Sequence, residues 1–118
     1  MIDLQEQWTP TQAEFDDFAA VSGDDNAIHV DPAFCARTTF GRTVSHGMLI
    51  YSKLWGILKR HDADMKQESQ NLMFPNPAFV GEELTLRVFH DNTGRLRMLA
   101  TRTSDGAECL VGEAVITC

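Results

Sequence analysis

Residues 45–60 read SHGMLIYSKLWGILKR, and this stretch decides the fold. Its apolar side chains recur around most of a helical circumference, and a helix of that kind is expected to be buried. Lys59, Arg60 and His61 suit the negative end of the helix dipole. We therefore predict a core helix from about Ser45 to Arg60. Its apolar residues are Met48, Leu49, Ile50, Tyr51, Leu54, Trp55, Ile57 and Leu58.

Downstream of this helix the pattern changes to that of β-strands, with apolar and β-branched residues between turn sequences. Asn92-Thr93-Gly94 and Asp105-Gly106 are typical of the turns in β-hairpins. Helices followed by an antiparallel meander predict an α+β fold in which a sheet wraps around the core helix. The predicted strands are LMF before Pro75, residues 84–90, residues 95–103 and residues 108–118.

Upstream of the core helix, two shorter helices and a loop are predicted. Thr11-Gln12-Ala13-Glu14 fits a capping box for a helix over about residues 11–21, which should stop at Gly23. The run GDDNAIHVDP that follows is typical of a loop, so its histidine is expected on a loop. Asp31-Pro32 then predicts the start of a short helix that runs through Ala36.

The length of 118 residues fits a single domain over residues 1–118. Ten Lys and Arg against 17 Asp and Glu give a formal net charge of −7, which disfavours nucleic acids and anionic membrane surfaces as partners. A phosphate-bearing ligand would need a local basic patch. The candidates for such a patch are Arg37, Arg42, Lys53, Lys59 and Arg60.

The cysteines and the N-terminal residues bear on the compartment. Cys35, Cys109 and Cys118 are odd in number and scattered, without C-x-x-C spacing or a histidine cluster that would complete a zinc site. We expect reduced thiols and no metal. The first residues have no apolar run of signal-peptide length, and no stretch is long enough for a membrane span. These features favour a cytoplasmic protein.

Ser22-Gly23-Asp24-Asp25-Asn26-Ala27-Ile28-His29 is the first segment with chemical potential. A carboxylate and an imidazole five residues apart on a turn can point at one spot, where one removes a proton from water and the other delivers a proton to carbon. Read alone, the segment fits an Asx-rich turn with a solvated histidine better than a catalytic pair.

Two further segments follow. Ser45-His46-Gly47-Met48 places a glycine at a helix N-terminus, where free backbone N–H groups can stabilise an enolate-like oxygen. A simple helix start with a close packing contact is the alternative. Residues 74–84, FPNPAFVGEEL, are a proline-rich turn that leads into a strand.

In combination, the segments resemble the MaoC-like family of (R)-specific enoyl-CoA hydratases, which have the hot-dog fold. The family pattern S-G-D-x-N-P-[LIV]-H is matched by residues 22–29, and an Asp-Pro helix start and H-G-M follow in order. P-x-[FY]-V-G-[DE] is matched by residues 77–82. The likeness runs from about Thr11 to Ile116.

The resemblance implies Asp24 as the catalytic carboxylate, His29 as the catalytic imidazole and the Gly47 N–H as donor to the thioester oxygen. The family spacing selects Asp24 rather than Asp25, and Asn26 is expected to contact the substrate. Ala27 replaces the usual proline, so the backbone of this turn is less restricted in the unfolded chain. Which of Asp24 and His29 deprotonates water stays open.

The reaction implied is water addition across the 2,3 double bond of an enoyl thioester, or its reverse. It needs a base, an acid and an oxyanion donor, and no cofactor beyond the thioester carrier, which is CoA or an acyl carrier protein. A homodimer or a dimer of dimers is expected, because an exposed sheet edge can pair with a second copy. The alternatives are a thioesterase and a noncatalytic acyl-binding subunit.

Tyr51, Trp55 and Leu58 follow Gly47 at helical intervals of 4, 4 and 3, so they share one helix face. An acyl chain held at Gly47 is expected to run along this face. Because Trp55 is bulky, the pocket should be short and should prefer acyl chains of about four to six carbons. The same stripe is also compatible with ordinary core packing.

Overall fold

The structure, a computed structural model, describes residues 1–117 as one antiparallel sheet and four helices. Cys118 lies outside the described residues, so neither its thiol nor the end of the predicted strand over 108–118 is described. The elements in chain order are β1 (Asp3–Trp8), α1 (Gln12–Ser22), α2 (Ala27–Val30), α3 (Pro32–Ala36), α4 (Gly47–His61), β2 (Lys66–Met73), β3 (Leu84–His90), β4 (Leu96–Arg102) and β5 (Glu108–Thr117).

The five strands form a sheet in the order β1-β3-β4-β5-β2. The two predicted hairpins are confirmed: β3 pairs with β4 and β4 with β5, and Gly94 and Gly106 in the turns have positive φ. β2 is second in the chain but pairs with β5, the last strand, so it lies at the opposite edge of the sheet from β1. β1 and β2 are therefore the two edge strands.

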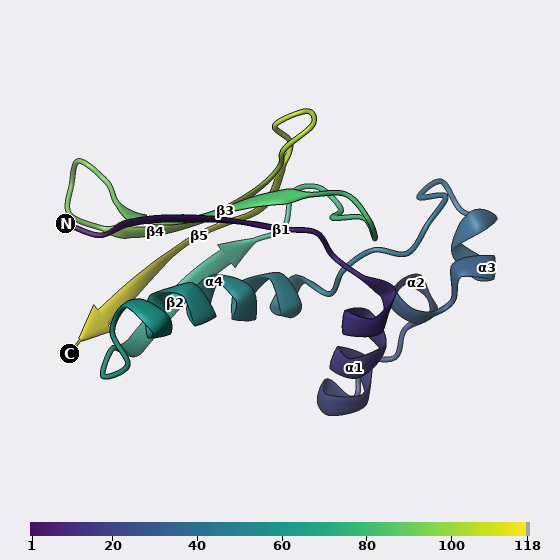
Figure 1. Cartoon of the computed structure of the whole chain (residues 1–118), viewed down its shortest axis with the longest axis horizontal. Helices are drawn as coiled ribbons and strands as arrows, with labels where there is room; N and C mark the ends of the chain where they lie inside the picture. Colours follow the sequence, from purple (N-terminus) through teal and green to yellow (C-terminus); the bar gives the residue numbers. More distant parts are fainter. Residues whose placement is uncertain (118) are drawn as a thin grey trace.

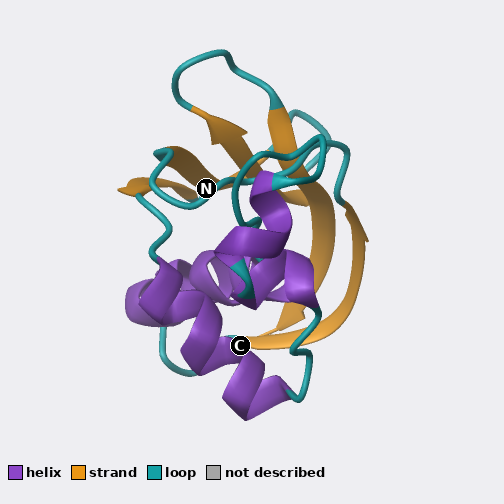
Figure 2. Cartoon of the chain, turned by 90° about the vertical axis from the view of Figure 1, so that its right-hand side faces the viewer, coloured by secondary structure: helices purple, strands orange, loops and turns teal. Residues whose placement is uncertain are grey.

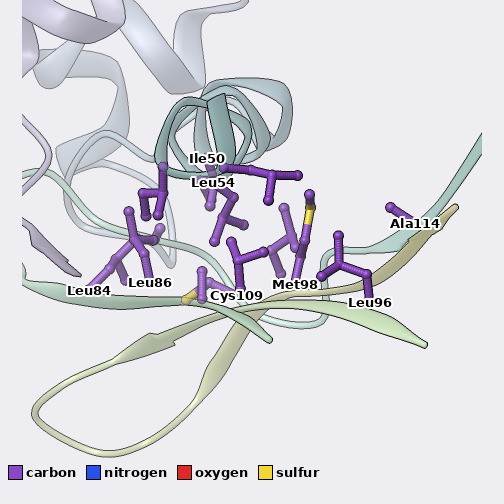
Figure 3. Packing of buried hydrophobic residues seen from close by; sticks show 14 of the residues in the cluster. Ile50, Leu54, Leu84, Leu86, Leu96, Met98, Cys109 and Ala114 are labelled. Carbon is purple, nitrogen blue, oxygen red and sulfur yellow. The ribbon is translucent and has the colours of Figure 1, made fainter. Parts of the chain in front are cut away.

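Helix α4 lies along one face of the sheet (Figure 1), and the sheet curves around one side of the helices (Figure 2). Its Leu54 and Leu58 are fully buried. Leu54 faces strand residues such as Leu86, Met98 and Cys109 on the side of the sheet where buried apolar residues alternate along β3 and β4 (Figure 3), and Leu58 belongs to the same cluster. This packing confirms the predicted sheet around a core helix.

Burial of α4 is less complete than its sequence predicts. Tyr51 and Trp55 are half-buried, and Met48 in the first turn is 46% exposed. The sheet covers only one side of the helix in this chain, so the apolar residues on the other sides keep contact with solvent.

The sequence pattern predicts only a small part of the two edge strands. β1 has the sequence DLQEQW and β2 has the sequence KQESQNLM, and both are rich in polar residues. An edge strand gains its partner through backbone hydrogen bonds on one side, and polar side chains there limit pairing with other chains. Hydrophobic alternation is consequently weak in both.

The three short helices lie together beyond the end of the sheet, next to the start of α4 (Figure 1). The capping box between Thr11 and Glu14 is present, and α1 ends at Gly23, whose φ of 82° suits glycine. The predicted Asp31-Pro32 helix start is confirmed. Among the described residues, no helix is long and apolar enough to cross a membrane.

Candidate active site

His29 lies on helix α2, which corrects the expectation that it sits on a loop. Asn26 makes the difference, because its side-chain oxygen accepts a hydrogen bond from the Ile28 N–H and caps a single helical turn. The Gln12 side-chain amide donates to the His29 carbonyl oxygen at 2.9 Å and so ties α2 to the first turn of α1. The backbone of His29 is thereby fixed from both sides.

Residues 43–46 form an extended segment that joins this helical end to the rest of the fold. The Val44 N–H donates to the Ile28 carbonyl, and the Ser45 N–H donates to the Ala78 carbonyl. Val44 also forms a β-bridge with Phe79. The segment therefore connects α2 to the proline-rich turn after β2, and it delivers the chain directly into α4.

The Asp24 and His29 side chains face each other across 3.7 Å, measured from Asp24 Oδ2 to His29 Nε2. The His29 side chain is 10% exposed, whereas that of Asp24 is 56% exposed. The separation is longer than a direct hydrogen bond and leaves both groups able to bind one water molecule. The pairing that the sequence suggested is therefore present in the fold.

The other ring nitrogen of His29 fixes the direction of the imidazole. Its Nδ1 lies 2.8 Å from the Val44 carbonyl oxygen, which can only accept a hydrogen bond. Nδ1 therefore carries a hydrogen, and in the neutral ring Nε2 has a free lone pair directed to the Asp24 side. That nitrogen can accept a proton from a water molecule.

Gly47 is the first residue of α4, where backbone N–H groups have no intrahelical partner. A Cβ atom built on it would lie 2.7–2.9 Å from the Phe74 ring. A side chain at this position would have to displace the Phe74 ring, so glycine is favoured here. The helix start is thus an N–H donor with an aromatic wall beside it.

Asp24, His29 and Gly47 line one cavity of about 570 Å³. The rest of its wall is mainly apolar. Phe40, Met48 and Phe74 are partly exposed at its rim, whereas Ile50, Ala78 and Cys109 are buried and form its inner end. A polar reacting centre at the edge of an apolar cavity can hold an acyl chain with a polar group at one end.

The other residues expected to contact substrate do not line this cavity in the described part of the chain. Asn26 caps α2. Leu58 is fully buried in the core, and Tyr51 and Trp55 pack against the same core. The stripe of Tyr51, Trp55 and Leu58 follows α4 along the sheet, whereas the cavity leaves the helix after Ile50 and runs to the turn at residues 74–78.

The basic residues considered for a phosphate ligand are mostly engaged elsewhere. Arg42 pairs with Glu82, Lys53 pairs with Glu14, and Arg60 pairs with Glu6. The Lys59 ammonium group donates to the backbone carbonyls of Ala63 and Met65, in the segment between α4 and β2.

His46 was noted in the sequence only as part of H-G-M, yet it belongs to the cavity wall. It is 2% exposed, and its ring stacks on that of His29 with centroids 3.9 Å apart and 24° between the planes. Burial lowers the pKa of His46 below its usual value. Its place directly before Gly47 was the signal available in the sequence.

Asp24, His29 and His46 bring three potential metal ligands within 4.8 Å of one another. Lone pairs of imidazole nitrogens lie in the ring planes, so two nearly parallel rings do not point them at one ion at the ~2.0–2.1 Å that such ligands need. The arrangement suits proton transfer better than metal coordination.

A family model described as a MaoC-like domain matches residues 2–108. In sequence the chain is 39% identical over 111 residues to an (R)-specific enoyl-CoA hydratase of Aeromonas caviae, a match that covers 88% of this chain and 83% of that protein. It is 29% identical over 101 residues to a 3-hydroxybutyryl-CoA dehydratase of Methylorubrum extorquens, covering 84% and 62%.

Solved structures agree with the sequence relatives. The (R)-hydratase from A. caviae involved in PHA biosynthesis matches with a TM-score of 0.87 at 33% identity, covering 98% of this chain and 93% of that chain. R-hydratase PhaJ1 from Pseudomonas aeruginosa matches with a TM-score of 0.83 at 26% identity, covering 98% and 78%. The fold is the hot-dog fold, and the chain belongs to the MaoC-like domain family.

Proposed function

We propose that this protein is a hydro-lyase that adds water to the 2,3 double bond of an enoyl thioester, giving the (R)-3-hydroxyacyl thioester, or catalyses the reverse. One observation carries the proposal. Asp24 Oδ2 and His29 Nε2 lie 3.7 Å apart on the wall of an apolar cavity that also contains the first N–H of α4. The 39% identity to an (R)-specific enoyl-CoA hydratase supports the same assignment.

The reaction requires a water molecule held between Asp24 and His29. The oxygen of this water bonds to C3 as one of its protons passes to the pair, and the electrons of the double bond move into the thioester carbonyl. The Gly47 N–H donates a hydrogen bond to the oxygen that gains charge. A proton then passes from the pair to C2, so the thioester carbonyl re-forms and the two side chains return to their initial protonation states.

The apolar inner end of the cavity supports an acyl chain as the group that enters it. Ile50, Ala78 and Cys109 offer no hydrogen-bonding side chain other than a buried thiol whose pKa is raised by burial. The carrier is CoA or an acyl carrier protein and remains outside, beyond the exposed rim of Phe40, Met48 and Phe74.

We further propose that the active form is at least a dimer, either a homodimer or a dimer of dimers. The partly exposed rim and the uncovered side of α4 present apolar side chains, and both sheet edges carry unpaired backbone groups. Sedimentation at micromolar concentration, followed by assay of the same sample, tests this. An active monomer contradicts it.

Crotonyl-CoA is the substrate that tests the proposed function. Hydration removes the absorbance of the enoyl thioester and releases no thiol, whereas a thioesterase releases thiol. Loss of absorbance without thiol release, abolished in Asp24→Asn, supports the proposal. Thiol release indicates a thioesterase, and binding of the thioester without either signal indicates a noncatalytic acyl-binding subunit.

A further inference from the structure

His46 is a buried titratable residue to which the reaction above gives no part. It is 2% exposed and sits at the N-cap position of α4, but its side chain makes no capping hydrogen bond to the helix. Burial of a polar side chain costs free energy because its hydrogen bonds to water are lost, so other contacts of the ring must offset this cost. Its contacts show where the ring is engaged.

One nitrogen of the ring holds the backbone beside the catalytic carboxylate. His46 Nε2 lies 2.8 Å from the carbonyl oxygen of Asp24, and because a carbonyl only accepts, the ring N–H donates. Asp24 otherwise follows α1 in an exposed turn, where the Ser22 hydroxyl accepts from its backbone N–H. The His46 bond therefore anchors the exposed Asp24 to a buried point next to α4.

The face of the same ring holds the catalytic imidazole. The His46 ring stacks on that of His29, with centroids 3.9 Å apart, and also contacts the tilted ring of Phe18, with centroids 4.8 Å apart. His29 is also fixed by its hydrogen bond to the Val44 carbonyl. The stack prevents the His29 ring from tilting about that bond, so its Nε2 keeps its direction toward Asp24.

The protonation of His46 agrees with such a role. With Nε2–H donating to Asp24, the Nδ1 atom is buried and has no hydrogen-bond partner among the described residues. A charged ring would add an unpaired buried N–H beside His29, and burial accordingly lowers the pKa of His46. A neutral His46 leaves His29 free to take up a proton without a second positive charge in contact.

We propose that His46 is a positioning residue: its single imidazole, through one hydrogen bond and one stacking contact, fixes Asp24 and His29 relative to each other. This rests on the proposed function, since it assigns the geometry of that pair. Its effect is expected in turnover rather than in substrate binding, because His46 acts through the two side chains that transfer protons.

Two substitutions separate the two contacts. His46→Phe keeps an aromatic ring on His29 but removes the donor to Asp24, whereas His46→Gln keeps an N–H donor near the position of Nε2 but removes the ring. In hydration of crotonyl-CoA, His46→Phe is expected to lower kcat about five- to tenfold with KM within about threefold, the loss typical of one hydrogen bond. His46→Gln is expected to recover part of this loss.

Phe15→Leu is the matched control, because Phe15 is fully buried against the edge of His46 but lines no part of the cavity. It should reduce Tm and leave kcat unchanged. A kcat of His46→Phe within twofold of wild type overturns the proposal. So does an equal loss of kcat in all three variants, which indicates a packing role only. His46→Leu replaces His46→Phe if the latter does not fold.

A second readout is independent of the reaction. In NMR spectra, the ¹³C resonance of the Asp24 carbonyl should move in His46→Phe and stay close to wild type in His46→Gln. An unchanged carbonyl resonance in His46→Phe overturns the proposal even if the protein hydrates crotonyl-CoA. The predicted shift in a protein without hydratase activity upholds the contact and contradicts the proposed function instead.

Discussion

The start of α4 and the rest of the helix differ in the surroundings of their side chains. His46, Gly47 and Met48 lie on the cavity, where contacts come from α1, α2 and the turn after β2. Leu54 and Leu58 are fully buried in the core cluster that the helix forms with the strands. The body of the helix requires apolar bulk, whereas its start requires particular side chains from distant parts of the chain. The start of α4 thus contributes to the candidate site, whereas the rest of the helix contributes to the stability of the fold.

The largest expected effect is at the cavity. Asp24→Asn and His29→Ala should each lower kcat for enoyl-CoA hydration at least ~10²-fold, the typical worth of a general acid or base, with little change in Tm. Asp25→Asn is the matched control, because its carboxylate is adjacent but does not line the cavity, and it should retain near wild-type kcat. A folded Asp24→Asn variant with wild-type turnover contradicts the assignment.

The body of α4 should respond in the opposite way. Leu58→Ala removes a side chain with no exposure and should lower the free energy of unfolding by ~2–5 kcal/mol, measured by urea denaturation. Because Leu58 lies away from the cavity, kcat/KM per folded molecule should not change with this substitution. A loss of catalytic efficiency with unchanged stability would return Leu58 to the substrate-binding role that its helical spacing suggested.

Gly47→Ala tests the boundary between the two regions. The added methyl group meets the Phe74 ring at 2.7–2.9 Å, so the ring must move, and we expect a loss of about tenfold in kcat/KM. Gly56→Ala, on the same helix, has its nearest neighbour at 3.4 Å and should stabilise the protein by ~0.5–1 kcal/mol. If contact with Phe74 causes the loss, adding Phe74→Ala should restore part of it. No restoration would place the cause elsewhere.

The smallest effect concerns acyl-chain length. Ile50→Ala enlarges the inner end of the cavity and should shift the preference toward longer enoyl-CoA substrates, by up to ~0.8 kcal/mol, or about fourfold in kcat/KM, for each added methylene that fits. Trp55→Ala should keep the wild-type profile, because Trp55 packs against the core. The reverse result, a shift in Trp55→Ala alone, would place the acyl chain along the helix face.

The sequence predicted the parts of the fold in which local pattern and final environment agree. The α4 helix, the capping box at Thr11 and the glycine turns of the hairpins are of this kind. β1 and most of β2 could not be predicted in the same way. Their polar residues fit an edge position that depends on β3 and β5, which lie far away in the chain.

In the candidate site, too, the features set by local sequence could be predicted and those set by distant contacts could not. Asp24 and His29 are close in sequence and Gly47 begins a recognisable helix, so a family pattern could single out all three as candidates, and the fold places them on one cavity. The direction of the cavity could not be predicted from the sequence, because Phe74 and Cys109 line it from separate elements of the fold. Helical spacing alone extended the predicted site along α4 to Trp55, which packs against the core in the structure.

The extended segment of residues 43–46 also has a consequence for local opening. Helices α1 to α3 lie outside the sheet core, and their connections to it include the Val44 bridge and the Ser45 hydrogen bond to Ala78. Such a region can exchange its amide hydrogens through partial unfolding, at a lower free energy than the strands around Leu54. A thioester bound in the proposed way would contact both sides of this connection, so substrate would slow hydrogen exchange in the half of the molecule that carries Asp24 and His29.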